Sequence, residues 1–95
     1  MKVHYTELAE SDLHEIAAHT EKEFGAEQRD VYLRALEEAC ENTLPQFPSI
    51  ARSVPQRPEL LRWRCERHVI YFRLVEDGLE IVRVLHERML PDLHL

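Results

Sequence analysis

Arginines and histidines in the C-terminal half are the residues of this chain best suited to chemistry. Arg62, Arg64, Arg73 and Arg83 lie inside apolar runs that read as strands. A guanidinium group is a planar fork that binds phosphate or carboxylate through two hydrogen bonds. His86 follows the last run, and imidazole, with an unperturbed pKa of about 6.5, can transfer protons near neutral pH. These residue types predict an anion-binding surface or, as an alternative, a site for general acid–base catalysis.

Binding is the stronger of these two interpretations. Catalysis would fall to Arg73, Arg83 and His86, but no tyrosine or lysine follows His86 to act on a leaving oxygen. Arginines also line solvated sheet faces without any function, and a histidine at a strand end is commonly structural. The candidate partner-binding residues are Arg62, Arg64, Tyr71, Arg73, Arg83, His86, Arg88 and Met89.

Other common kinds of site find no support in the sequence, and we expect neither a metal nor a cofactor. His14 and His19 are five residues apart, so they do not share a helix face as a pair of metal ligands would. The chain has only two glycines, which excludes a glycine-rich phosphate loop. Cys40 and Cys65 fall on apolar positions and are expected to be reduced core residues of a cytosolic protein, with a disulfide between them as the lesser alternative.

The net charge of −6 is unevenly distributed along the chain. Residues 7–44 carry eleven acidic and three basic side chains, whereas residues 45–95 carry seven acidic side chains and eight arginines. This balance argues against indiscriminate nucleic-acid binding. It leaves room for a local basic surface in the second half.

Periodicity predicts a single domain, residues 1–95, with a strand, two amphipathic helices and three strands. Thr6 is the expected N-cap of the first helix, Gly25 its C-terminal stop, and Pro45 the end of the second helix. Four prolines in residues 45–59 predict an irregular surface loop there. The predicted elements occupy residues 2–5, 7–24, 26–44, 60–65, 68–75 and 79–86. No apolar run approaches the length of a membrane helix, and no signal peptide is expected.

The register of the last hairpin decides which way its arginines point. A three-residue loop, Glu76 to Gly78 with Gly78 left-handed, keeps Arg83 off the apolar face. This register puts one set of side chains under the helices: Ile70, Phe72, Leu74, Val82 and Val84, joined by Leu61, Trp63 and Cys65. The opposite face would carry Val69, Tyr71, Arg73, Ile81, Arg83 and Leu85, joined by Leu60, Arg62 and Arg64. The expected fold is α+β, with a helical hairpin on one face of an antiparallel sheet.

Three stretches of the chain resemble ParE-type toxins of the RelE/ParE superfamily: "YTELAESDLHEIAAHTEKEFGAEQRDVYLRAL", "LRWRCERHVIYFR" and "DGLEIVRVLHERM". The resemblance implies a β-α-α-β-β-β fold and the toxin of a type II toxin–antitoxin (plasmid stabilisation) module. Such a toxin inhibits growth and is neutralised by a ParD-like antitoxin, whose C-terminal segment wraps around it. Characterised ParE-type toxins poison DNA gyrase, whereas RelE-type relatives cut mRNA on the ribosome.

This sequence departs from the RelE-type pattern because it is acidic and its tail lacks tyrosine. We therefore favour a non-enzymatic gyrase inhibitor over a ribosome-dependent mRNA interferase. A third interpretation is a non-toxic protein that keeps the fold and binds an antitoxin. The expected location is cytoplasmic, with no membrane partner and no direct sequence-specific nucleic-acid binding. An acidic or apolar antitoxin segment is expected in the helix groove and at the sheet edge, with Arg62, Arg73 and Arg83 facing its acids.

Overall fold

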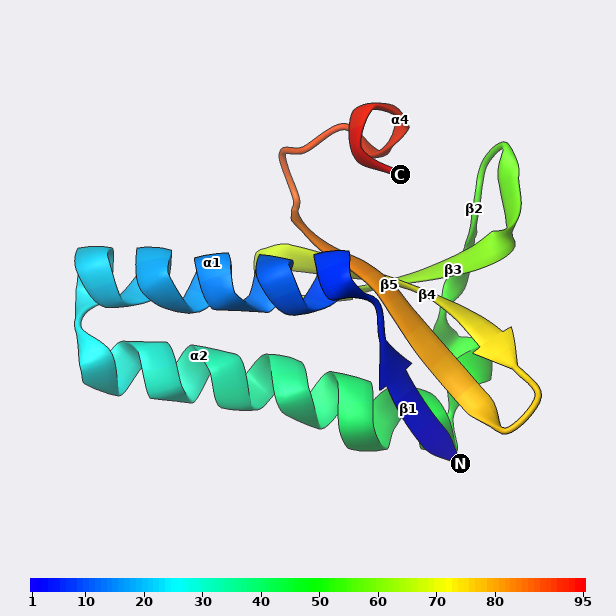
Figure 1. Cartoon of the computed structure of the whole chain (residues 1–95), viewed down its shortest axis with the longest axis horizontal. Coiled ribbons are helices and arrows are strands. Elements are labelled where there is room, and N and C mark those ends of the chain that lie inside the picture. The colour runs from blue at the N-terminus through cyan, green and yellow to red at the C-terminus, as the bar shows by residue number, and fades with distance from the viewer.

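The computed structural model describes residues 1–95, in which a helical hairpin packs against one face of a five-stranded sheet (Figure 1). The strands are β1 (Lys2–Tyr5), β2 (Arg52–Val54), β3 (Arg57–Cys65), β4 (His68–Val75) and β5 (Gly78–His86). The α-helices are α1 (Glu7–Phe24), α2 (Ala26–Glu38), α3 (Leu44–Gln46) and α4 (Pro91–His94). None of the helices combines the length and the apolar character that a membrane span requires.

The sheet has the strand order β1-β5-β4-β3-β2 and is mixed. β1 runs parallel to β5, and the other neighbours are antiparallel. The predicted α+β class and its order of elements are confirmed. The prediction of an irregular loop over residues 45–59 is wrong in part, because β2 forms there and β3 begins at Arg57. Pro55 and Pro58 are tolerated because they lie at the edge hairpin, where not every amide has to donate to the sheet.

The helical hairpin begins and turns where the sequence predicts. Thr6 caps α1, since its side-chain oxygen accepts a hydrogen bond from the Ala9 amide at 3.0 Å. Gly25 adopts φ +92° between α1 and α2. Pro45 does not end the second helix, contrary to the prediction. The chain instead continues from α2 through a π-helical turn, Ala39–Thr43, into α3, where proline is accepted in the first turn.

The predicted register of the β4–β5 hairpin is wrong near its turn. Val75 pairs with Gly78 across a two-residue turn, and a bulge at Val82 shifts the register between Phe72–Ile81 and Tyr71–Arg83. Ile81 therefore faces the helices, fully buried, while Val82 packs on the opposite face. Arg83 still alternates with Val84 as predicted and pairs with Tyr71, because the bulge restores the predicted alternation beyond it.

Gly78 is required for a different reason from the one predicted. Its backbone is not left-handed; the glycine with positive φ is Gly25. A Cβ atom at Gly78 would lie 1.9 Å from the Lys2 carbonyl oxygen. Glycine at this position allows the parallel strand β1 to lie against β5.

Apolar side chains are buried on both faces of the sheet. The main core lies under the helices and includes Leu36, Leu44, Ile70, Phe72, Leu79 and Ile81. A second cluster of Val54, Leu60, Tyr71 and Leu85 lies on the opposite face, with Leu95 of the tail packed against it. The predicted arginine face is thus partly apolar and covered by the tail. Tyr71, expected to be an outward-facing phenol, is 3% exposed.

Candidate partner-binding surfaces

The sheet register places Arg62, Tyr71 and Arg83 in one row across three strands. Arg62 of β3 pairs with Tyr71 of β4, and Tyr71 pairs with Arg83 of β5. Residues opposite each other on neighbouring strands point to the same face. Burial raises the pKa of the Tyr71 phenol, and the positive charge of Arg62 opposes this shift.

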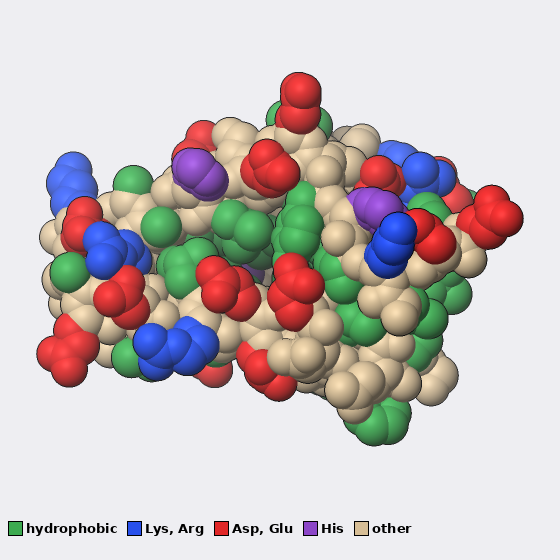
Figure 2. Space-filling view, turned by 60° about the horizontal axis from the view of Figure 1, so that its bottom comes forward, with side chains coloured by type: hydrophobic (Ala, Val, Ile, Leu, Met, Phe, Trp, Pro, Cys, Tyr) green, Lys and Arg blue, Asp and Glu red, His purple; other side chains and the backbone are tan.

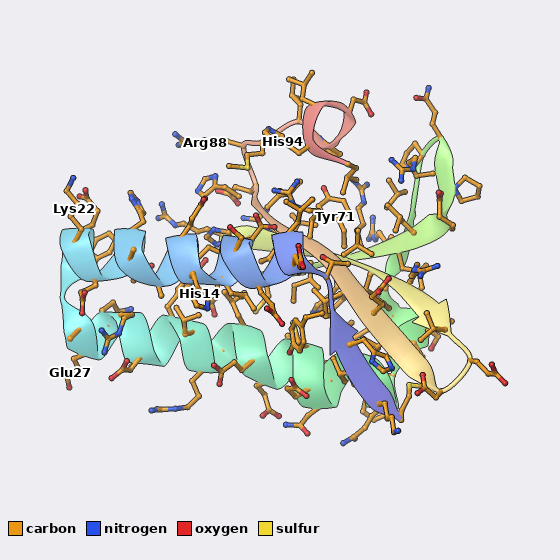
Figure 3. The ribbon with its side chains drawn as sticks, in the orientation of Figure 1. His14, Lys22, Glu27, Tyr71, Arg88 and His94 are labelled. Atoms are coloured by element: carbon orange, nitrogen blue, oxygen red, sulfur yellow. The ribbon has the colours of Figure 1, made fainter.

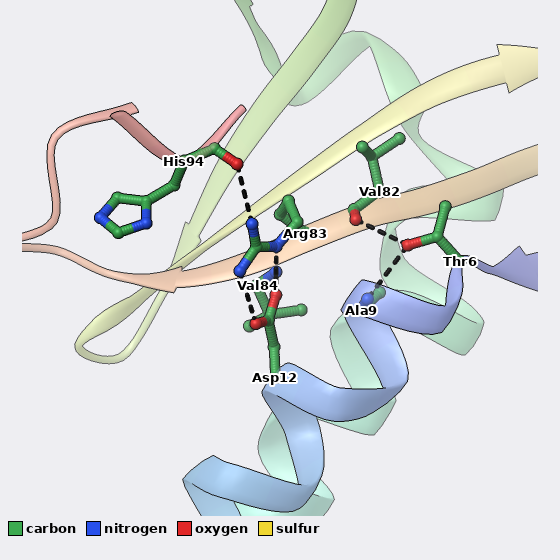
Figure 4. A network of polar contacts seen from close by, with 7 residues as sticks. All are labelled: Thr6, Ala9, Asp12, Val82, Arg83, Val84 and His94. Atoms are coloured by element: carbon green, nitrogen blue, oxygen red, sulfur yellow. Dashed lines mark hydrogen bonds and ion pairs between the residues drawn. The ribbon is translucent and has the colours of Figure 1, made fainter. Parts of the chain in front are cut away.

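Arg83 is bound within the chain rather than free (Figure 4). Its Nε donates to Asp12 Oδ2 and its Nη2 to Asp12 Oδ1, both at 2.8 Å, and its Nη1 donates to the His94 carbonyl at 2.8 Å. The side chains are only 16% and 11% exposed for Arg83 and Asp12. The hydrogen bonds to Asp12 raise the pKa of Arg83. The pair thus ties α1 to β5 and to the C-terminal tail.

Asp12 also completes the edge of the sheet. Since β1 ends at Tyr5, the side of β5 that faces away from β4 has no neighbouring strand beyond Ile81. Thr6 donates to the Val82 carbonyl at 2.7 Å, and Asp12 accepts from the Val84 amide at 2.9 Å (Figure 4). These two side chains replace the missing strand.

Asp12 was not among the residues that the sequence analysis singled out. The signal was present, because Asp12 lies on the same helix face as Ala9 and Ile16, which are buried. A carboxylate on the apolar stripe of a helix indicates a buried partner for its charge.

Two further predicted arginines have acidic partners on the sheet surface. Arg73 Nε lies 2.8 Å from Glu80 Oε1, and Arg64 pairs with Glu87. Both arginine side chains are about half exposed or more, so these pairs are weak and exchangeable. Arg62 is the one candidate arginine on the strands that makes no ion pair in the chain.

The predicted alternative catalytic residues do not converge. Arg73 lies near the β4–β5 turn, opposite Glu80, whereas His86 lies at the other end of β5, opposite His68. Arg83 lies between them and is held by Asp12. The three residues are thus spread along the hairpin and do not line one common hollow.

His86 belongs instead to a small cluster with His68 and Tyr32. The His68 and His86 rings meet edge-to-face with centroids 5.3 Å apart, and the Tyr32 hydroxyl lies 2.6 Å from His68 Nδ1. Burial and the neighbouring His86 lower the pKa of His68 to about 4. An open hollow beside this cluster, of about 820 Å³, is also lined by His19 and Arg67. The sequence analysis singled out His86 but not Tyr32, which lies on α2.

Arg88 and Met89 lie in the tail between β5 and α4. Both side chains are exposed, and Figure 3 shows Arg88 pointing away from the body of the protein. The Arg88 amide donates to His86 Nδ1 at 3.1 Å, which orients the imidazole ring. These residues are available to a partner but do not touch the arginine row.

A separate groove runs along the outer side of the helical hairpin. Leu13, Ala17 and Leu33 supply apolar lining to this hollow of about 530 Å³, and Glu37 is among the acids beside it. Figure 2 shows hydrophobic side chains between the helices with acidic side chains on both sides. The remaining lining residues are Tyr5, Glu10, His14 and Glu41. The groove thus combines an apolar floor with a negatively charged rim.

The sequence and the fold match known toxins. Residues 3–91 match the family described as "ParE toxin of type II toxin-antitoxin system, parDE". The chain is 33% identical over 89 residues to Toxin ParE1 from Mycobacterium tuberculosis strain CDC 1551 / Oshkosh. Toxin ParE1 from strain H37Rv matches equally, and each match covers 92% of this chain and 90% of the relative.

Two solved structures share the fold. A chain of the chromosomal ParDE toxin–antitoxin system from Pseudomonas aeruginosa superposes with a TM-score of 0.78 at 21% identity. A chain of the toxin–antitoxin complex RelBE2 from M. tuberculosis gives a TM-score of 0.67 at 19% identity. Each match covers 90% of this chain and 95% of the other chain. The match over nearly the whole sequence, with a relative above 30% identity, establishes that this chain belongs to the ParE toxin family of type II toxin–antitoxin systems.

Proposed function

We propose that this toxin arrests growth by binding and poisoning DNA gyrase, and that a ParD-like antitoxin neutralises it. The observation that carries a binding mechanism is the dispersal of Arg73, Arg83 and His86 along the hairpin, with Arg83 neutralised by Asp12. Cleavage of a phosphodiester needs an acid and a base placed around one phosphate. Inhibition by binding needs only exposed surface, which the helix groove and the tail supply.

The gyrase target is tested with purified components. Toxin produced without antitoxin is added to gyrase, and both supercoiling and covalent cleavage complexes are measured. We expect inhibition at micromolar toxin and its relief when the antitoxin is added first. Growth arrest in cells together with unaffected gyrase would reject this target.

A ribosome-dependent mRNA interferase is the second candidate, and the histidine cluster favours it. His68 is neutral at pH 7, because its pKa is lowered to about 4, and it contacts His86 beside a hollow that Arg67 lines. Primer extension on translated messages separates the two functions. Codon-positioned cuts that His86→Ala abolishes, while the exposed tail control His94→Ala retains them, would replace gyrase inhibition with cleavage.

We further propose that an apolar face of the antitoxin occupies the groove between α1 and α2. The groove floor is apolar, and its rim carries Glu10, Glu37 and Glu41, so an acidic segment would be repelled there. Of the acidic or apolar segment expected from the sequence, we therefore keep only the apolar one for the groove, and we expect it to have basic flanks. Leu13→Glu should weaken antitoxin binding at least tenfold, since it puts a charge on the apolar floor.

Leu8→Glu is the matched control for this experiment. Leu8 lies on the same helix, is 58% exposed and does not line the groove. Its substitution should leave antitoxin affinity within about twofold. Equal loss of binding in the two variants would show that the groove is not the site of contact.

A further inference from the structure

Two arginines face each other across the strands β2 and β3 without an acidic partner. Arg52 and Arg62 are directly opposite in the antiparallel pair, so their side chains leave the same face with Cβ atoms about 5 Å apart. Each of the other four arginines on the strands forms an ion pair, whereas these two form none. Like charges directly opposite each other destabilise a sheet. An anion bound beside both would remove that cost.

These arginines extend the row across the sheet to its edge. The register runs from Arg52 through Arg62 and Tyr71 to Arg83. The Arg83 end is closed, because its guanidinium is held by Asp12 and the tail carbonyl of residue 94. The Arg52 end is open, since β2 is the outermost strand. A ligand can therefore reach the unpaired arginines from the β2 side.

The unpaired edge of β2 favours an extended polypeptide as the ligand. An outermost strand has N–H and C=O groups without partners on one side, and these can pair with an added extended chain. Arg52 and Ser53 of this outermost strand are exposed. A residue of an added strand opposite Arg52 would continue the row. Its carboxylate would lie beside Arg52 and within reach of the long side chain of Arg62.

We propose that an acidic, extended segment of the antitoxin adds to the outer edge of β2 and places a carboxylate against Arg52 and Arg62. The inference rests on the proposed neutralisation by an antitoxin, and it names a second contact distinct from the helix groove. A carboxylate fits better than a nucleic-acid backbone. Only two arginines are unpaired here, and the protein as a whole carries a net charge of −6.

The test compares the free toxin with its antitoxin complex. Arg52→Glu and Arg62→Glu should each weaken binding of the antitoxin at least tenfold, because each introduces a carboxylate where the ligand's carboxylate binds. The control is Arg67→Glu, which makes the same charge change at an exposed turn residue whose side chain has no ion pair. The control should keep affinity within about twofold. Amide hydrogen exchange should slow over residues 52–54 when the antitoxin binds.

A second readout needs no partner. Arg52→Glu replaces two facing arginines by an opposite-charge pair, so the free toxin should melt about 2–5 °C higher while the complex becomes weaker. This combination is expected only if the arginine pair is kept for binding. Equal losses in Arg52→Glu and Arg67→Glu, or unchanged exchange over residues 52–54, would overturn the inference while antitoxin binding itself persists. No binding of antitoxin to the unaltered toxin would instead reject the proposed neutralisation, and this inference with it.

Discussion

Substitution of Asp12 by alanine tests whether one carboxylate holds helix, sheet and tail together. The change removes both hydrogen bonds to the Arg83 guanidinium and the acceptor of the Val84 amide. What is left is a cation that is 16% exposed and bonded only to the carbonyl of His94, together with an unpaired amide at the sheet edge. Both groups then lie in a poorly hydrated site without a partner.

The expected loss is about 2–4 kcal/mol of the free energy of unfolding. Breaking a fully buried ion pair from one side costs roughly 3–5 kcal/mol. We expect a smaller loss than for a fully buried pair, because Asp12 and Arg83 keep slight solvent contact and Arg83 retains its hydrogen bond to the His94 carbonyl. A domain of this size has a total stability of about 5–14 kcal/mol, so the loss is a large fraction of it. Asp12→Asn, which keeps an acceptor but removes the charge, should lose about half as much.

Urea unfolding followed by far-ultraviolet circular dichroism gives these free energies directly. Asp92→Ala removes an exposed tail carboxylate that forms no ion pair, and should leave the midpoint unchanged. The double variant Asp12→Ala/Arg83→Met then measures the coupling, which we expect at about 1–3 kcal/mol. A coupling below about 0.5 kcal/mol, or a loss in Asp12→Ala below about 1 kcal/mol, would refute the role assigned to this pair.

Two further predictions concern stability. Gly78→Ala should lower the free energy of unfolding by about 3 kcal/mol or more, because its methyl group would meet the Lys2 backbone. Gly25→Ala meets no atom within 4 Å and should cost only the strain of φ +92° and ψ 168°, about 1–3 kcal/mol, so a larger loss in Gly25→Ala than in Gly78→Ala would contradict this explanation. The native pKa of His68, about 4, lies below the unfolded value of about 6.5. The contribution of neutral His68 to the free energy of unfolding is therefore fully present above pH 6.5 and is lost as the pH falls towards 4, because the unfolded chain binds the proton first. After allowance for partial exposure the loss is about 1–2 kcal/mol, and subtracting the pH profile of His68→Gln isolates it from other groups; parallel profiles would show that His68 does not contribute.

The helical hairpin was predictable because its signals are local. Thr6 as the cap and Gly25 as the turn each act within a few residues, and the structure confirms both. The two-residue turn between β3 and β4 was also predicted, as the gap between the strands 60–65 and 68–75, and the pairing of Cys65 with His68 confirms it. The prediction that the side chains of Leu61 and Trp63 face the helices is also confirmed.

The errors arise where two distant segments decide the outcome. The bulge at Val82 lies where β5 passes the end of β1 while it stays paired with β4, and the pattern of β5 alone does not reveal the end of β1. The partner of Arg83 lies 71 residues away on α1, and no spacing rule joins them. The second apolar cluster joins residues of four strands, and Leu95 of the distant tail packs against it. Sequence pattern identified the arginines but could not show which were already neutralised.

The charges of the two proposed antitoxin contacts place a condition on any segment that covers both. The helix groove is rimmed by acids, whereas the β2 edge presents Arg52 and Arg62. A uniformly acidic segment would gain at β2 and lose at the groove, and a uniformly basic one would do the reverse. An antitoxin segment that binds along this path therefore has to change charge along its length. If both contacts form, this requirement would make the pairing specific, because a segment with the order reversed would meet like charges at both ends.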